Sequence, residues 1–363
     1  LWLYKHRRDL MDEVTAQKQS LFDTGHRVGE CAKQLFPGGV EIEFNSKDFD
    51  GMARMTVDLI EQGADTLYEA TFKEKGIFAM ADILHRTVEG WDIYEVKAST
   101  STKPYHLDDA AVQYYALSNV LHINQVFIVH INNQYLRNGN LDVEALLTVD
   151  DVTTDVLDRQ EGIPGYLEHF ASMLKGGVPD IDIGPQCLDP YECDFKGHCW
   201  SHVPDRSVFN LYRMGWKERF DLYNSGILTY GDISDSYVLT HIQRLQVDSS
   251  VSGGAVVNKE VIRDFLDTLE YPISFLDFET FTEAVPRFDN QRPYMQMAFQ
   301  YSLHVLEAMG ELSHAEYLGD ELIDPRREVS ERLLEALPES GSIVAYNQSF
   351  EISRIRDLAG LFP

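Results

Sequence analysis

The stretch Trp91–Thr100, WDIYEVKAST, decides the expected fold. Its β-branched and aromatic residues are typical of a largely buried strand. Glu95 and Lys97 nevertheless occupy its middle, and because strand side chains alternate, the two share one face. Burying two ionic groups is costly unless they pair or bind a ligand. The stretch therefore indicates either a buried site or an edge strand that holds both charges in solvent.

A further acid precedes this stretch in the segment FAMADIL. Asp82 lies there, on the preceding strand candidate. If the two strands form a hairpin, Asp82 can meet Glu95, and two carboxylates can hold a divalent cation. Lys97 can then orient a water molecule or stabilise charge on a phosphate. The residues themselves leave both interpretations open, the metal and phosphate site and the solvent-facing edge strand.

The order of elements around these residues carries a family resemblance. The sequence predicts a helical segment over residues 1–36, then a further helix, three strands, a helix and a strand. ADIL, YEVKAST and DDAAVQYYAL resemble PD-(D/E)XK nucleases of the RecB type, in particular the branch of the CRISPR-adaptation nuclease and AddB. The resemblance implies a restriction-endonuclease-like α/β core in which Asp82 and Glu95 bind Mg²⁺ or Mn²⁺. It also implies catalytic roles for Lys97 and for Gln113 of the following helix, whereas Gly29 stands where the family has an early histidine.

Three of the four cysteines are clustered in CLDPYECDFKGHC, at Cys187, Cys193 and Cys199. Three thiols in one segment can share a metal or a cluster, so zinc, an iron–sulfur cluster and free thiols are all open. The RecB-type branch implies a [4Fe–4S] cluster with these three as ligands. In that family the first cysteine lies just before a segment similar to LWLYKH, so we expect the fourth ligand upstream of Leu1, with Cys31 as the alternative.

A second set of acids lies near the end of the chain. Asp277 and Glu279 in SFLDFETF share one strand face, as a two-metal phosphodiesterase requires. In AYNQSFE, Asn347 is expected to open a helix and Glu351 to follow one turn later. The order of three strands, helix, strand and helix is similar to ribonuclease-H-like DEDD exonucleases. Glu351 stands where that family has Asp, and the third motif is expected beyond Pro363.

Composition limits the possible classes of protein. A net charge of −28 argues against a nonspecific nucleic-acid coat but permits an enzyme that uses metal ions against phosphate. No run of 18 apolar residues appears, so we expect no membrane partner and a cytoplasmic location. The chain starts at Leu1 rather than Met and stops at Pro363 within a helical pattern, so a fragment is expected.

Together these features predict three parts. They are a RecB-type nuclease domain with iron–sulfur cysteines over 1–205, a helical connector over 206–268, and a truncated DEDD-like ribonuclease-H-fold domain over 269–363. LWLYKH, CLDPYECDFKGHCW, FLDFETF and AYNQSFE resemble a bacterial and archaeal family that joins such a nuclease to a DEDD-like domain of unknown function. The expected function is a metal-dependent DNA nuclease, an exonuclease on single strands or ends. The alternatives are an inactive nucleic-acid-binding module and an RNA exonuclease acting through the DEDD-like domain.

Overall fold

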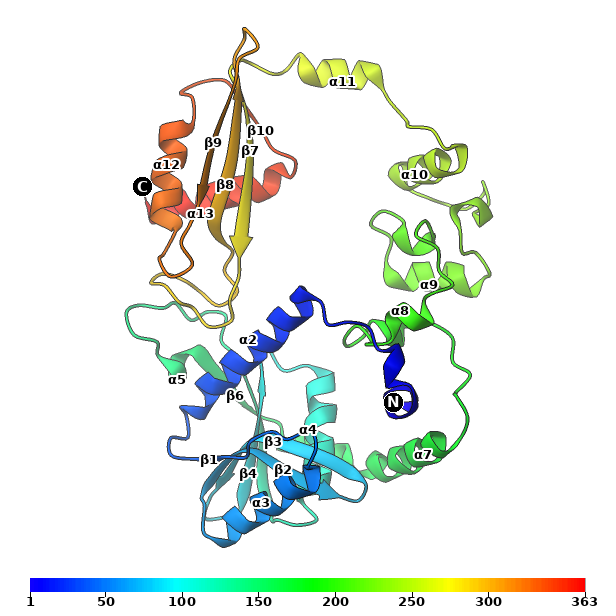
Figure 1. Ribbon diagram of the computed structural model, residues 1–363, viewed down its shortest axis with the longest axis vertical. Helices are drawn as coiled ribbons and strands as arrows, with labels where there is room; N and C mark the ends of the chain where they lie inside the picture. Colours follow the sequence, from blue (N-terminus) through cyan, green and yellow to red (C-terminus); the bar gives the residue numbers. More distant parts are fainter. Residues whose placement is uncertain (363) are drawn as a thin grey trace. The chain divides into compact units, whose positions relative to one another are not determined.

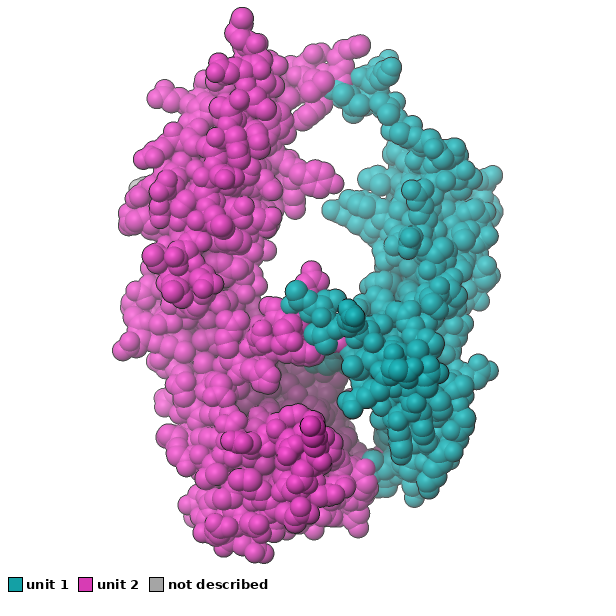
Figure 2. Space-filling view, in the orientation of Figure 1, with its two compact units in different colours: residues 1–16, 164–262 teal, residues 17–163, 263–363 magenta. Residues whose placement is uncertain are grey.

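A computed structural model describes residues 1–362, which divide into two compact units coloured separately in Figure 2. The first unit comprises residues 1–16 and 164–262, and the second comprises residues 17–163 together with residue 263 onward. This division differs from the expected domain boundaries. The start of the chain joins the first unit because the Trp2 indole N–H donates to the Gly176 carbonyl at 3.1 Å and the Asp12 N–H donates to the Asp194 carbonyl at 2.7 Å.

One of the two sheets of the second unit is mixed and has six strands. Its strands lie in chain order: β1 (Val40–Glu41), β2 (Thr66–Glu74), β3 (Ile77–Arg86), β4 (Trp91–Lys97), β5 (Ile123–Ile131) and β6 (Leu147–Asp151). β1 pairs with β2 and β4 with β5 in parallel, and the other neighbours are antiparallel. The parallel β4–β5 pair requires a crossover, which helix α4 (Pro104–Leu117) provides.

Helices pack on this sheet through apolar residues. The helices are α2 (Ala16–Lys33), α3 (Phe49–Glu61), α5 (Val143–Leu146) and α6 (Thr153–Asp158). Val28 and Ala32 of α2 are fully buried in one hydrophobic cluster with Ile83 of β3 and Val129 of β5. The Asp48 carboxylate caps α3 by accepting the Gly51 N–H at 2.8 Å. The predicted helical segment over residues 1–36 is largely helical but interrupted, because the chain is non-helical between Leu10 and Ala16.

The second unit also contains a four-stranded sheet. Its order is β10 (Ser342–Val344), β7 (Ile273–Phe281), β8 (Met297–Leu306) and β9 (Leu312–Leu318), and its helices are α12 (Arg326–Ala336) and α13 (Gln348–Leu361). Leu276 and Phe278 of β7 pack in one cluster with Val329 of α12 and Leu358 of α13. Both helices therefore contribute to the core on the face of β7 that carries these two residues; Figure 1 shows them beside the strands.

The first unit is built mainly of short helices. They are α1 (Trp2–His6), α7 (Ile163–Lys175), α8 (Lys196–Cys199), α9 (Trp216–Asn224) and α10 (His241–Ser252), and α11 (Lys259–Leu266) leads out of the unit. Val208, Phe220 and Val247 share its core. The expected helical connector over 206–268 is thus helical, although it belongs to this core. No helix in the described part of the chain has the length and apolarity needed to cross a membrane.

Candidate active site

The expected hairpin of β3 and β4 brings Asp82 to Glu95. The strands pair with Ile83 opposite Tyr94, so continuing that register places Asp82 opposite Glu95. The backbone ladder ends there, and the Val96 N–H instead donates to Asp82 Oδ2 at 2.6 Å. The Asp82 carboxylate thus takes the place of a ladder acceptor, which fixes it against the strand that carries Glu95 and Lys97.

Lys97 and Gln113 hold the Glu95 carboxylate from two sides. Lys97 Nζ donates to Glu95 Oε1 at 2.6 Å, and Gln113 Nε2 donates to Glu95 Oε2 at 2.7 Å. Lys97 Nζ also donates to Asp109 Oδ2 at 2.6 Å, from one turn earlier on α4. Glu95 is only 5 % exposed. The four predicted residues therefore lie together, and Asp109 joins them although its sequence context gave no signal beyond helical spacing to Gln113.

Burial and the repulsion between Asp82 and Glu95 raise the pKa values of both carboxyl groups. Burial raises the pKa of Asp82 to about 6, against the opposing effect of the Val96 N–H and with added repulsion from Glu69. Burial raises the pKa of Glu95 well above its ordinary value, and repulsion from Asp82 adds to the rise. Burial lowers the pKa of Lys97, but attraction by Glu95 and Asp109 outweighs that effect and raises it. Two acids that resist ionisation next to a firmly charged lysine are typical of a functional site.

A cavity of about 660 Å³ opens over Asp82. Glu69 lines it from β2, at the position opposite Asp82 in the β2–β3 register, with a left-handed backbone of φ 56° that a strand residue rarely adopts. His26 lines the cavity from α2, between Gly25 and Gly29. A Cβ atom added at either glycine would meet no atom within 4 Å, so the space beside both glycines is open. His26 was not predicted as a site residue, because the resemblance places the family histidine at position 29, where this chain has a glycine.

The oxygen donors suit a hard divalent cation. Asp82 and Glu95 offer carboxylate oxygens, the ligands that Mg²⁺ and Mn²⁺ prefer. Gln113 Oε1 is buried and has no hydrogen-bond partner among the described residues. Among those same residues no three His, Cys, Asp or Glu side chains converge closely enough to form a metal-binding group. The pair of acids therefore fits a cation that keeps water or substrate oxygens as its remaining ligands.

The cysteine segment lies in the first unit beside the start of the chain. The Cys193 N–H donates to the Cys187 carbonyl at 2.9 Å, and the Gly197 N–H donates to Asp12 Oδ2 at 2.9 Å. Burial raises the pKa of Cys199, and the neighbouring Cys193 and Cys187 thiols add to the rise. Among the described residues, the three cysteines do not form a metal-binding group.

Cys31 lies apart from this segment in the chain, on α2 in the core of the second unit. It is buried, and burial raises the pKa of its thiol. A protonated core thiol is an inert packing group rather than a thiolate ligand.

The second set of predicted acids comes from strand β7 and helix α13. Asp277 and Glu279 alternate along β7 with Leu276 and Phe278, whose side chains pack with the helices, so the two exposed acids project from the other face. Asn347 is the N-cap residue of α13, as expected. Glu351 is buried one turn later on the same helix face as Leu358, and its Oε2 has no described hydrogen-bond partner. Helix α13 therefore packs on the face of β7 that carries Leu276 and Phe278, whereas Asp277 and Glu279 lie on the other face of the strand.

Comparison with known proteins covers only the end of the chain. Residues 274–363 match the family described as a domain of unknown function, DUF2779. No curated protein and no solved structure matches the chain. The match includes Asp277 and Glu351 but not Asp82 or Glu95, and it assigns no activity, so a function is inferred from the geometry of the site.

Proposed function

We propose that the chain is a metal-dependent nuclease that hydrolyses DNA phosphodiester bonds, as an exonuclease on single strands or ends, with its centre at Asp82, Glu95, Lys97 and Gln113. The observation that carries the proposal is the set of direct contacts around one buried carboxylate. Glu95 accepts from Lys97 and from Gln113, while Asp82 lies opposite it in register. A purely structural ion pair requires no second acid and no open cavity above that acid.

Asp82 and Glu95 would provide the protein oxygens for a divalent cation, which, when bound, would supply an activated water and neutralise charge on the scissile phosphate. Gln113 holds one Glu95 oxygen by its amide, which leaves the orientation of that carboxylate fixed. Lys97, held by Glu95 and Asp109, keeps its ammonium charged beside the reacting phosphate, where negative charge develops in the transition state.

Two substitutions at the centre test this proposal. We expect Glu95→Gln and Lys97→Ala to lower the rate of cleavage of labelled single-stranded DNA by about 10²- to 10⁴-fold in Mg²⁺ or Mn²⁺. Lys73→Ala serves as the control, because Lys73 pairs with Asp50 at the surface of β2. Cleavage at the wild-type rate by both site variants would exclude this centre. Tight binding of DNA without turnover in any divalent cation would favour the alternative, a binding module without catalysis.

We propose in addition that Cys187, Cys193 and Cys199 hold a [4Fe–4S] cluster as a structural staple. This proposal is supported by the hydrogen bonds that join Asp12, near the start of the chain, to the cysteine segment. Sulfur-only donors suit iron–sulfur clusters and zinc alike. We expect anaerobically purified protein to show the broad absorption near roughly 400 nm that thiolate-bound iron produces. A colourless protein that contains zinc would refute the cluster.

A further inference from the structure

A second cavity, of about 600 Å³, lies in the part of the chain that matches DUF2779. It shares no lining residue with the cavity over Asp82. Its walls come from the segment that connects β7 to β8 and from helix α13. The lining side chains are mostly polar: Thr282, Asn290, Arg292, Tyr294, Met295, Gln296, Arg354 and Asp357.

Two arginines give this cavity an excess of positive charge. Arg354 is 9 % exposed, its Nη2 pairs with Asp357 Oδ2 at 2.8 Å, and its Nε has no described hydrogen-bond partner. Arg292 is exposed, and it forms no side-chain hydrogen bond or ion pair with any residue that the structure describes. Two guanidinium groups face a single lining carboxylate, in a chain whose net charge is −28. Planar guanidinium donors match the oxygens of a phosphate group.

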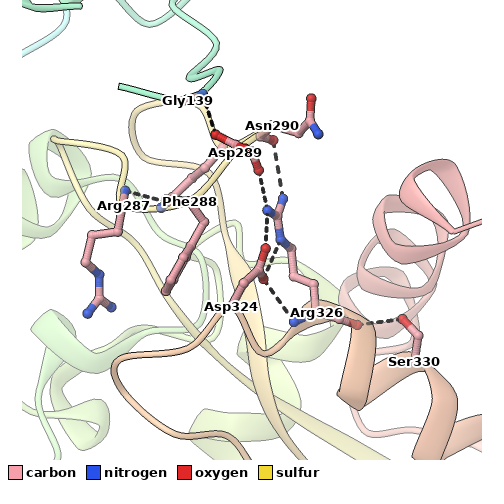
Figure 3. A network of polar contacts seen from close by, with 9 residues as sticks. Gly139, Arg287, Phe288, Asp289, Asn290, Asp324, Arg326 and Ser330 are labelled. Carbon is pink, nitrogen blue, oxygen red and sulfur yellow. Dashed lines mark hydrogen bonds and ion pairs between the residues drawn. The ribbon is translucent and has the colours of Figure 1, made fainter. Parts of the chain in front are cut away.

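The wall that carries Arg292 is held rigidly. Arg326 is 4 % exposed, and its guanidinium donates to the carbonyls of Asp289 and Asn290 while pairing with Asp324 (Figure 3). Asn290 and Tyr294 both adopt left-handed backbones, with φ values of 56° and 59°. Such conformations persist where the surrounding contacts over-determine them, and they gather at ligand sites. The cavity is therefore formed before any ligand arrives, which reduces the entropy lost on binding.

The same wall is bonded to the strand of the nuclease centre. The Tyr294 hydroxyl donates to the carbonyl of Ala98, the residue that follows Lys97. The Asn290 N–H donates to the Arg137 carbonyl at 2.8 Å, and Arg137 Nη1 donates to the Pro286 carbonyl at 2.7 Å. These contacts hold the segment before β8 against the end of β4 and against the loop that follows β5.

We infer that this cavity is a phosphate subsite for the backbone of the DNA strand that the Asp82–Glu95 centre cleaves. The inference rests on the proposed function. Arg292 contacts the phosphate from the open side, and Arg354 supplies charge from behind it. Because phosphate contacts carry no base information, the subsite strengthens binding of all sequences equally.

Fluorescence anisotropy with labelled single-stranded DNA in EDTA tests the subsite without any cleavage. We expect Arg292→Ala to weaken binding about five- to tenfold and to reduce the slope of log K against log salt by about one. Asp357→Asn removes the competing carboxylate and is expected to tighten binding. Arg356→Ala is the matched control: it removes the same charge from an exposed position on α13 that does not line the cavity.

The outcomes separate this inference from the proposed function. Equal affinities for wild type, Arg292→Ala and Arg356→Ala overturn the subsite, while loss of cleavage in Lys97→Ala still supports the nuclease. Inorganic phosphate alone provides a second probe. If phosphate raises the melting temperature of the wild type but not of Arg292→Ala, and DNA affinity is unchanged, the cavity takes a free phosphate compound rather than a strand. Absence of DNA binding by the wild type overturns both proposals.

Discussion

Asp82 is the residue whose charge state matters most to the candidate site. Burial and repulsion from Glu69 and Glu95 make ionisation of its carboxyl group unfavourable in the folded protein, and the hydrogen bond from the Val96 N–H at 2.6 Å offsets this only in part. A divalent cation would reverse that penalty, because an ion between two carboxylates stabilises their charged forms. In the metal-free protein, ionised Asp82 should therefore lower the free energy of unfolding by a measurable amount.

This destabilisation predicts that the effect of Asp82→Asn on stability depends on pH. Burial raises the pKa of folded Asp82 from 3.8 to about 6. The unfolded chain thus releases this proton first, and stability falls as pH rises from 3.8 to 6. In EDTA at pH 7.5 we expect Asp82→Asn to raise the free energy of unfolding by roughly 1 to 3 kcal/mol. At pH 3.5 most of the gain should be lost, because the carboxyl group is then mostly protonated in both states.

Urea unfolding at the two pH values measures the effect. Asp58→Asn, at an exposed position of α3, is the control and should change stability at neither pH. A variant that is equally stable or less stable than the wild type at pH 7.5 would contradict the account of Asp82 as a strained, buried acid.

Sequence reasoning succeeded at this scale where one local rule was enough. Strand alternation placed Glu95 with Lys97, and the hairpin placed Asp82 opposite Glu95. Asp109 was missed because an aspartate on an exposed helix face is ordinary, and only the ion pair with Lys97 distinguishes it. Glu69 was a possible further member of the metal site, but strand alternation with one partner unknown left its position open, and its left-handed backbone is not predictable for a non-glycine residue.

At the scale of elements, helix α3 completes the edge of β2 where no strand covers it. The short β1 pairs only with Leu67 and Tyr68. Further along, the Thr71 N–H donates to Thr56 Oγ1 of α3 at 3.0 Å, and both threonines are fully buried. A side chain thus replaces a ladder acceptor on the strand that also presents Glu69.

Removing that acceptor should weaken the sheet. Thr56→Val keeps the shape but leaves the Thr71 N–H unpaired, and we expect a loss of about 1 to 3 kcal/mol in the free energy of unfolding. Thr56→Ser keeps the hydroxyl and should lose less. Urea unfolding gives the energies, and hydrogen exchange should show faster exchange of the Thr71 amide in the valine variant. A valine variant at least as stable as the serine variant would refute this role.

The element order was readable because hydrophobic periodicity and turn residues are local signals. The strands from Thr66 to Lys97, helix α4 and the order β7 to α13 match the expected elements. The faces of the second sheet were not readable in the same way. Asp277 and Glu279 share one face as expected, but which face α13 covers depends on packing of Leu276 and Phe278 against Leu358.

At the scale of the whole chain, contacts between distant segments decide the organisation. Residues 1–16 associate with residues beyond 163, and the loop before β8 bonds to Arg137 and Ala98. None of these pairings follows from periodicity, because the bonds of Arg137 and Tyr294 each join one side chain to a backbone carbonyl far away in the sequence. The α/β class was therefore predictable, whereas the division into two units was not.

The most direct measurement of the central claim is Mn²⁺ binding at pH 7.5, followed by calorimetry or electron paramagnetic resonance, without nucleic acid. Asp82→Asn and Glu95→Gln are compared with the wild type and with Asp58→Asn. We predict that the wild type and Asp58→Asn bind Mn²⁺ alike, and that each site variant binds at least about tenfold more weakly. Unchanged Mn²⁺ affinity in both site variants would contradict the claim that these two carboxylates share a cation.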